Sequence, residues 1–121
     1  MGNRIIIDIT DGVSFTPSFY GHWCGLRAVE VLNDLVRKKE YNGINSLMCN
    51  FITEVMEHKC QRYSYYIYSH GEAEGAADWD NYSWCLNPVT ETWTSTIPEL
   101  KGKTLSLCDA EEYIAKRKCE V

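Results

Sequence analysis

The sequence has no long apolar run, no C-x-x-C spacing and no excess of basic residues, and each absence argues against a class of protein. The first apolar run, Ile5-Ile6-Ile7, is far too short for a signal peptide or a membrane span. Without C-x-x-C spacing, a preformed zinc knuckle is not expected. The net charge of −5 argues against general binding to DNA or RNA, whose affinity comes largely from Lys and Arg on phosphates. We therefore expect a cytoplasmic protein that binds neither nucleic acid nor membrane.

The composition fits one domain that spans residues 1–121. Of the 121 residues, 45% are hydrophobic and 24% are charged, which are ordinary values for a globular domain. The chain shows no internal repeat, linker or low-complexity segment. Its six cysteines form an even number, which in a secreted protein would indicate a disulfide framework. In a cytoplasmic protein we expect reduced and mostly buried thiols instead.

Hydrophobic periodicity predicts an α+β fold, an antiparallel sheet with helices in the order β-β-α-α-β-β-β-α. Two strands, at residues 4–10 and 19–23, are expected to form an opening hairpin around Asp11-Gly12, because the tight turn needs a positive φ. Apolar residues at helical spacing predict one helix from Leu26 to the basic residues at 37–39 and a second helix over 44–55.

The second half of the chain is expected to add three strands and one helix. The strands are predicted at 62–69, which is rich in tyrosine, and at 82–86 and 92–97. The acidic, Gly/Ala-rich stretch 70–80 is expected to be a solvated loop. Its Trp79 must either fold back onto the core or wait for a stacking partner. Asp109 and Glu112 are interpreted as the capping box of the last helix.

The stretch 18–27 gathers three aromatic residues, a histidine, a thiol and an arginine. We interpret it as a strand that breaks at Gly25 into a helix, a junction where backbone N–H groups and side chains converge. Arg27 lies in the first turn of that helix, where free N–H groups favour an anion and a guanidinium adds bidentate contacts. The alternative is a surface arginine paired with Glu30 or Asp34.

A second cationic group lies in the last helix, at Lys116 and Arg117. If this group meets Arg27 across the fold or across a subunit boundary, two phosphates could be held. Aromatic side chains could then sandwich a base, the candidates being Trp23, Trp79, Tyr82 and Trp84. Asn87 is added to the ligand-binding candidates on its chemistry alone.

Catalysis and metal binding have weaker support. His22 and Cys24 lie two residues apart on a predicted strand and would share one face, which is the start of a nucleophilic pair. No third group that would orient the base is identifiable, so no catalytic residue is assigned. The three histidines, His22, His58 and His70, are scattered, and neither a metal nor a cofactor is expected.

The opening of the chain resembles a group of small phage-borne proteins that includes the first Thoeris anti-defence family. The resemblance rests on a strand that begins Asn3-Arg4-Ile5-Ile6-Ile7, on Pro17-x-x-Tyr20-x-His22-Trp23-x-Gly25, and on the amphipathic helix that follows. It implies a non-catalytic sponge that sequesters a cyclic ADP-ribose isomer made by bacterial TIR immune proteins, in pockets near a homodimer interface. Some members form larger rings that also take cyclic oligonucleotides. Within the motif, His22, Trp23 and Arg27 are the positions implied to face the ligand.

The sequence therefore supports three hypotheses. The first is a homo-oligomer, dimer or hexamer, that binds a cyclic nucleotide signalling molecule in the host cytoplasm without turning it over. The second is a small thiol enzyme that uses Cys24 and His22. The third is a protein-binding module that engages its partner through the tyrosine-rich strand and a face around Met48 and Phe51, although these two residues are expected to belong to the core.

Overall fold

The computed structural model describes residues 3–57 and 65–119. Its elements are β1 (Ile5–Ile9), β2 (Ser18–Gly21), α1 (Arg27–Lys38), α2 (Gly43–Glu57), β3 (Tyr65–Tyr68), β4 (Ser83–Asn87), β5 (Thr92–Ser95), the 3₁₀ turn η2 (Pro98–Leu100), β6 (Leu105–Ser106) and α3 (Leu107–Cys119). The predicted α+β class is confirmed, and the predicted element order is approximately right. The short elements η2 and β6 were not predicted, and the predicted strand start at 62–64 lies outside the described residues.

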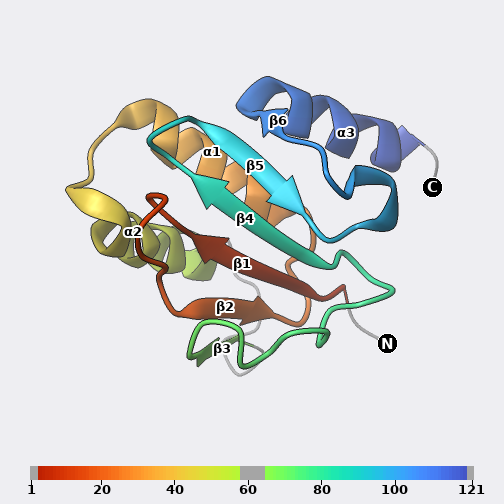
Figure 1. Ribbon diagram of the computed structural model, residues 1–121, viewed down its shortest axis with the longest axis horizontal. Helices are drawn as coiled ribbons and strands as arrows, with labels where there is room; N and C mark the ends of the chain where they lie inside the picture. The colour runs from red at the N-terminus through yellow and green to blue at the C-terminus, as the bar shows by residue number, and fades with distance from the viewer. Residues whose placement is uncertain (1–2, 58–64, 120–121) are drawn as a thin grey trace.

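The sheet has six strands in the order β3-β2-β1-β4-β5-β6 (Figure 1). Neighbouring strands pair antiparallel, with the exception of β1 and β4 at the centre, which run parallel. The prediction of an antiparallel sheet is therefore wrong for this central pair. The reason is the crossover at residues 70–81, which takes the chain from the outer strand β3 past β2 and β1 to β4.

The opening hairpin is confirmed. Its strands β1 and β2 pair antiparallel, and Asp11 Oδ1 closes the turn by accepting hydrogen bonds from the backbone N–H groups of Val13 (2.9 Å) and Ser14 (2.8 Å). Gly12 has a φ of +94°, the left-handed conformation that the Asp-Gly signal predicted. Strand β2 ends at Gly21, two residues earlier than expected.

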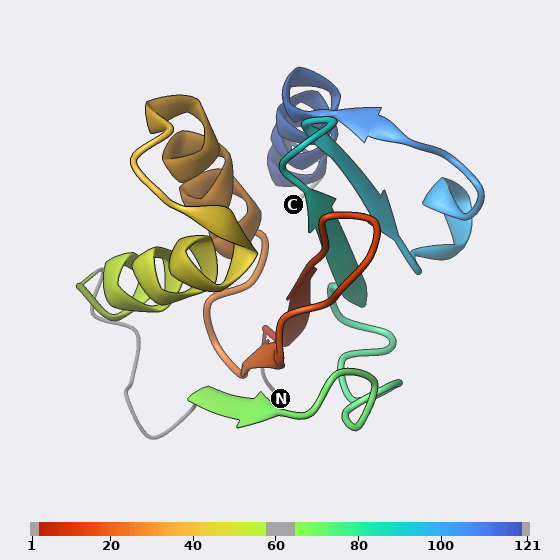
Figure 2. The ribbon, with the colours of Figure 1, turned by 60° about the vertical axis from the view of Figure 1, so that its left-hand side comes forward.

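One face of the sheet is covered by the helices and forms the core (Figure 2). Alternation along the strands sends one set of side chains to this face, namely Ile5, Ile7, Ile9, Phe19, Trp84, Leu86 and Trp93. Met48 and Phe51 of α2 are buried with them, which confirms their assignment to the core. The Trp93 indole N–H donates to Asn33 Oδ1 at 2.7 Å, so the buried amide of α1 has a partner.

The other face of the sheet is partly covered by the crossover. Most of residues 70–80 are exposed and none belongs to a helix or strand, as expected of a solvated loop, but the segment also packs against the sheet. Residues 70–81 form consecutive turns in which the N–H groups of residues 72, 74, 76, 78 and 80 each donate to the carbonyl three residues earlier. Ala73 and Ala77 are buried against Ile6 of β1. These small side chains let the turned backbone lie close to the sheet. Trp79 is 88% exposed, which shows that it does not fold back onto the core.

The last helix begins one turn earlier than predicted. The N–H of Asp109 donates to Ser106 Oγ (3.0 Å), and the N–H of Ser106 donates to Asp109 Oδ2 (3.5 Å). The capping box is thus Ser106 with Asp109, instead of Asp109 with Glu112. Leu107, the first helical residue, is buried in the core, and this burial sets where α3 starts.

The described thiols are not mostly buried, contrary to the expectation. Cys24 is buried and Cys85 is partly buried, whereas Cys49 and Cys108 are exposed; Cys60 lies outside the described residues. Burial, together with the charge of Asp8, raises the pKa of Cys85 to about 11. Across residues 3–57 and 65–119, none of the helices combines the length and apolarity that a membrane span requires.

Candidate functional site

The candidate site lies at the end of the sheet where β1 and β4 begin. Asn3, two residues before β1, makes two backbone hydrogen bonds to the connection between β2 and α1. Its N–H donates to the carbonyl of His22 (2.7 Å), and its carbonyl accepts from the N–H of Gly25 (2.9 Å). The entry to β1 and the entry to α1 are therefore held side by side.

Gly25 makes this close approach possible. Its φ is +56°, and a Cβ at this position would lie 2.2 Å from Nδ2 of Asn3, closer than non-bonded atoms can approach. The predicted break at Gly25 is confirmed, since α1 begins two residues later at Arg27. Leu26 occupies the N-cap position and provides no side-chain hydrogen bond to the first turn of the helix.

Arg4 ties the end of the crossover to β1. Its Nε donates to Asp80 Oδ2 (2.8 Å), and its two terminal nitrogens donate to the carbonyls of Ala76 (3.1 Å) and Asp78 (3.3 Å). The Arg4 backbone N–H donates to the same Asp80 oxygen at 3.0 Å. The side-chain hydrogen bond lowers the pKa of Asp80 and raises the pKa of Arg4, so both groups stay charged at neutral pH.

Asn81 continues this network and is 8% exposed. Its backbone N–H donates to the Arg4 carbonyl (3.1 Å), and its backbone carbonyl accepts from the Trp84 indole (2.9 Å). Its Nδ2 donates to the Arg4 carbonyl (3.0 Å) and to Asn3 Oδ1 (2.6 Å). Because a carbonyl can only accept, these contacts fix the orientation of both amides.

A hollow of about 340 Å³ opens beside the two asparagines, between the start of α1 and α3. It is lined by Asn3, Cys24, Leu26, Arg27, Glu30, Asn81, Ile114 and Arg117. Leu26 and Ile114 give it apolar walls, and the two arginines give it positive charge. The structure thus brings Arg27 and Arg117, the two cationic candidates from opposite ends of the chain, to one concavity.

Both arginines have carboxylate neighbours that an anion would have to displace. Arg27 Nη1 lies 3.8 Å from Glu30 Oε1, and Arg117 Nη1 donates to Glu99 Oε1 at 3.2 Å. The Arg117 guanidinium also lies 5.7 Å from the centre of the Tyr113 ring. Since the side chains of Arg27 and Arg117 are 53% and 44% exposed, water screens these pairs and they hold the arginines only weakly.

His22 and Trp23 precede the hollow in the chain and are not among the residues that line it. His22 Nδ1 lies 2.9 Å from the Tyr20 hydroxyl, and the His22 ring packs edge-on against Trp23 at 4.8 Å. Burial raises the pKa of Tyr20, so its phenol keeps its proton at neutral pH. Trp23 is 45% exposed and offers an aromatic face to a ligand that reaches beyond the hollow.

Trp79 and Asn87, two further predicted ligand-binding residues, are not among the residues that line the hollow. Trp79 has a φ of +70° and is almost fully exposed, with its ring 6.5 Å from that of Tyr82. Asn87 lies at the far end of β4, where its Oδ1 accepts from the N–H groups of Val89 (2.9 Å) and Thr90 (3.3 Å). Its side chain is used by the turn between β4 and β5, so the structure does not bring Asn87 to the predicted site.

The geometry assumed for a Cys–His pair is absent. Because β2 ends at Gly21, His22 and Cys24 lie in the connection and do not share a strand face. The His22 ring contacts Tyr20, and Cys24 is 7% exposed at the edge of the hollow. Among residues 3–57 and 65–119, no three His, Cys, Asp or Glu side chains come together to hold a metal ion, and His58 lies outside these ranges.

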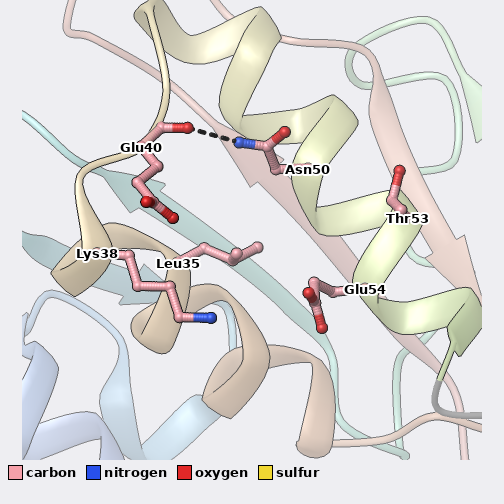
Figure 3. Close-up of a pocket in the computed structure, with 6 residues that line it drawn as sticks. All are labelled: Leu35, Lys38, Glu40, Asn50, Thr53 and Glu54. Atoms are coloured by element: carbon pink, nitrogen blue, oxygen red, sulfur yellow. Dashed lines mark hydrogen bonds between the residues drawn. The ribbon is translucent and has the colours of Figure 1, made fainter.

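Another hollow, of about 260 Å³, lies between the end of α1 and α2 (Figure 3). It is lined by Leu35, Lys38, Glu40, Asn50, Thr53 and Glu54, and Asn50 Nδ2 donates to the carbonyl of Glu40 at 3.1 Å. Two carboxylates and one ammonium make this hollow unsuited to a phosphate. A hollow of about 380 Å³ near Val89 is mainly apolar and has no cation in its lining.

Sequence reasoning missed four residues of the site, namely Asn3, Arg4, Asp80 and Asn81. Arg4 and Asp80 are separated by 76 residues, and no local pattern links them. The one available signal is that Asp80-Asn81 directly precedes a predicted strand, a position where polar side chains often bond to neighbouring backbone. Comparisons of the chain with protein-family models, curated proteins and solved structures find no match.

Proposed function

We propose that this chain binds a phosphate-bearing nucleotide in the hollow between α1 and α3 and releases it unchanged. The observation that carries the proposal is that Arg27 and Arg117 line one hollow with an apolar wall. Guanidinium groups suit phosphate because they offer several N–H donors in a planar fork. Arg27, which is half-exposed in the first turn of the twelve-residue helix α1, adds to this preference for an anion.

The specific ligand we propose is a cyclic ADP-ribose isomer, and the role is that of a phage sponge for this immune signal in the host cytoplasm. Such a molecule carries two linked phosphates, which matches two arginines in one site. The support for this identity is the resemblance of the opening residues, in which Trp23 also offers a half-exposed ring for stacking. No cofactor is required, because sequestration involves no chemical step.

A thiol enzyme is the competing function, and one observation favours it, namely that Cys24 lies at the edge of the same hollow. Two observations oppose it. Cys24 is 7% exposed, and the His22 ring is engaged by the Tyr20 hydroxyl. An activated thiolate needs a neighbouring base or cation and access to its substrate. Alkylation at neutral pH separates the two functions, since a Cys24 that reacts no faster than a free thiol is not a nucleophile.

Isothermal titration with a cyclic ADP-ribose isomer tests the proposal. We expect binding to the wild type, and an affinity loss of about tenfold or more in both Arg27→Ala and Arg117→Ala. Lys38→Ala, which removes a cation from the other hollow, is the matched control and should bind like the wild type. Absence of heat with the wild type rejects this ligand, and unchanged affinity in both arginine variants rejects the site.

Assembly with further copies of the chain is the second part of the proposal. Strand β3 is an outer strand of the sheet, and its four residues, Tyr65–Tyr68, carry no charge. Tyr66 and Ile67 are 49% and 53% exposed. An uncharged edge strand is a ready surface for pairing with a second copy. Light scattering should give a mass above 13.9 kDa for the wild type and a smaller mass for Ile67→Lys.

A further inference from the structure

Asn3 and Asn81 form a pair of side-chain amides in the wall of the hollow, and each has one polar group without a partner among the described residues. Asn81 uses its N–H, its carbonyl and its Nδ2, which leaves Oδ1. Asn3 uses its N–H, its carbonyl and its Oδ1, which leaves Nδ2. The pair therefore presents one acceptor and one donor.

The acceptor on Asn81 is the more informative of the two. Asn81 is 8% exposed, so most of the side chain is packed against protein, yet its Oδ1 is not sealed from solvent. A nearly buried oxygen without a protein partner bonds either to water or to a ligand, because a buried acceptor left without a bond is costly. Asn81 belongs to the wall of the hollow that also holds Arg27 and Arg117.

We propose that Asn81 Oδ1 determines specificity in this hollow by accepting a hydrogen bond from an N–H or O–H group of the ligand. The inference rests on the proposed function, and it narrows the ligand class to phosphates that carry such a donor, as a nucleotide does on its base amine and its ribose hydroxyls. The arginines alone attract any phosphate. Inorganic pyrophosphate has neither a base amine nor a ribose hydroxyl to offer Asn81, and its ionised oxygens are repelled by the amide oxygen.

The neighbouring donor on Asn3 fits the same ligand. The two side chains contact each other, and an amide oxygen on one with an amide N–H on the other suits the edge of a nucleobase, where a donor and an acceptor are adjacent. Gly25 belongs to this arrangement, because its missing side chain leaves the space that Asn3 Nδ2 occupies. The hollow thus combines a charged part for phosphate with an uncharged part that recognises the rest of the molecule.

The test compares two probes, ADP-ribose and inorganic pyrophosphate, by titration against the wild type and two variants. Asn81→Ala should weaken ADP-ribose binding about tenfold and change pyrophosphate binding by less than about twofold. Asn87→Ala is the matched control, because it removes the same kind of side-chain amide at the far end of β4, outside the lining of the hollow. Its ratio of the two affinities should stay within about twofold of the wild type. If Asn81→Ala does not fold, Asn81→Ser gives the same readout, since its hydroxyl keeps a donor near the Arg4 carbonyl.

Each outcome supports or overturns the inference. A selective loss of ADP-ribose affinity in the Asn81 variant supports it. An equal loss for both probes shows that Asn81 only maintains the fold; the inference then fails while the proposed function stands. Binding of pyrophosphate without binding of ADP-ribose overturns the inference and restricts the hollow to small anions. Binding of neither probe to the wild type overturns the inference, and the titration with a cyclic ADP-ribose isomer then decides the proposed function.

Discussion

The two ends of the central strand pair use polar side chains in opposite ways. Where β1 and β4 begin, the hydrogen bonds of Arg4 and Asn81 join residues 72 to 78 positions apart. Where β1 and β4 end, the side chains of Asp11 and Asn87 bond to backbone groups two or three positions away. One end is a long-range network beside a charged hollow, and the other consists of two self-contained turns.

This difference separates a candidate site from ordinary turn chemistry. A local hydrogen bond from an Asp or Asn side chain stabilises its own turn and does not depend on the rest of the fold. A long-range network exists only when the crossover, β1 and the start of α1 are all in place, so it links ligand-lining residues to the whole fold. We therefore expect matched substitutions to lower the free energy of unfolding more at the end with the long-range network than at the end with the two turns.

The largest difference is expected between two glycine substitutions. Gly25→Ala should cost about 3 kcal/mol, because a positive φ is strained with a side chain and the new Cβ displaces Asn3. Gly12→Ala, also at a positive φ, should cost about 1 kcal/mol, since its nearest neighbour lies at 3.9 Å. Urea denaturation measures both. Equal costs would show that backbone strain, and not the packing of Asn3, decides the effect.

The next difference is expected between the two asparagines. Asn81→Ala should lower the free energy of unfolding by about 2 kcal/mol, because it removes two hydrogen bonds from a nearly buried amide. Asn87→Ala should cost about 0.5 to 1 kcal/mol, since water can replace its bonds in an exposed turn. Chemical denaturation of the pair is the measurement. A larger loss for Asn87→Ala would contradict the comparison.

The same contrast explains how much could be predicted from the sequence. The opening turn was predicted because Asp11-Gly12 is a local signal, and α2 was predicted because its apolar residues repeat at helical spacing. The crossover was predicted as a solvated loop, and its packing against the sheet was missed, because this packing depends on Arg4 and on burial of Ala77 beside Ile6 of β1. Neither contact leaves a trace in the local sequence.

The candidate site was predicted only in part, because some of its residues follow from local signals and others depend on long-range packing. Arg27 follows from the strand-to-helix break at Gly25, which is visible locally. Arg117 lines the same hollow as Arg27 because of how α3 packs. From the sequence, a meeting of the two cations could be stated only as a possibility to be tested by the structure. Asn87 was assigned on its side-chain chemistry alone, whereas its amide oxygen is used by the turn between β4 and β5.

A smaller effect is expected from pH at the network end. Because the Arg4 hydrogen bond lowers the pKa of Asp80, the folded state binds fewer protons there than the unfolded state. The resulting stability is complete above the ordinary pKa of 3.8 and is lost as pH falls through the lower folded value. Asp80→Asn should therefore cost about 1 kcal/mol at neutral pH and close to nothing in stronger acid. Denaturation at both pH values checks this, and a cost that does not depend on pH would contradict it.

The smallest effect concerns the charge balance of the hollow itself. Glu30 lines it and lies 3.8 Å from Arg27, so its carboxylate competes with a bound phosphate for the same guanidinium. Glu30→Gln removes this competition while keeping the size of the side chain, and should tighten pyrophosphate binding about two- to threefold. Glu54→Gln makes the same change of net charge in the hollow between α1 and α2, and should leave the affinity unchanged.

Titration at two salt concentrations completes the test, since the gain from Glu30→Gln should shrink as salt screens the charges. Equal gains in the two variants would mean that net charge, and not the hollow beside Asn81, governs the binding of anions.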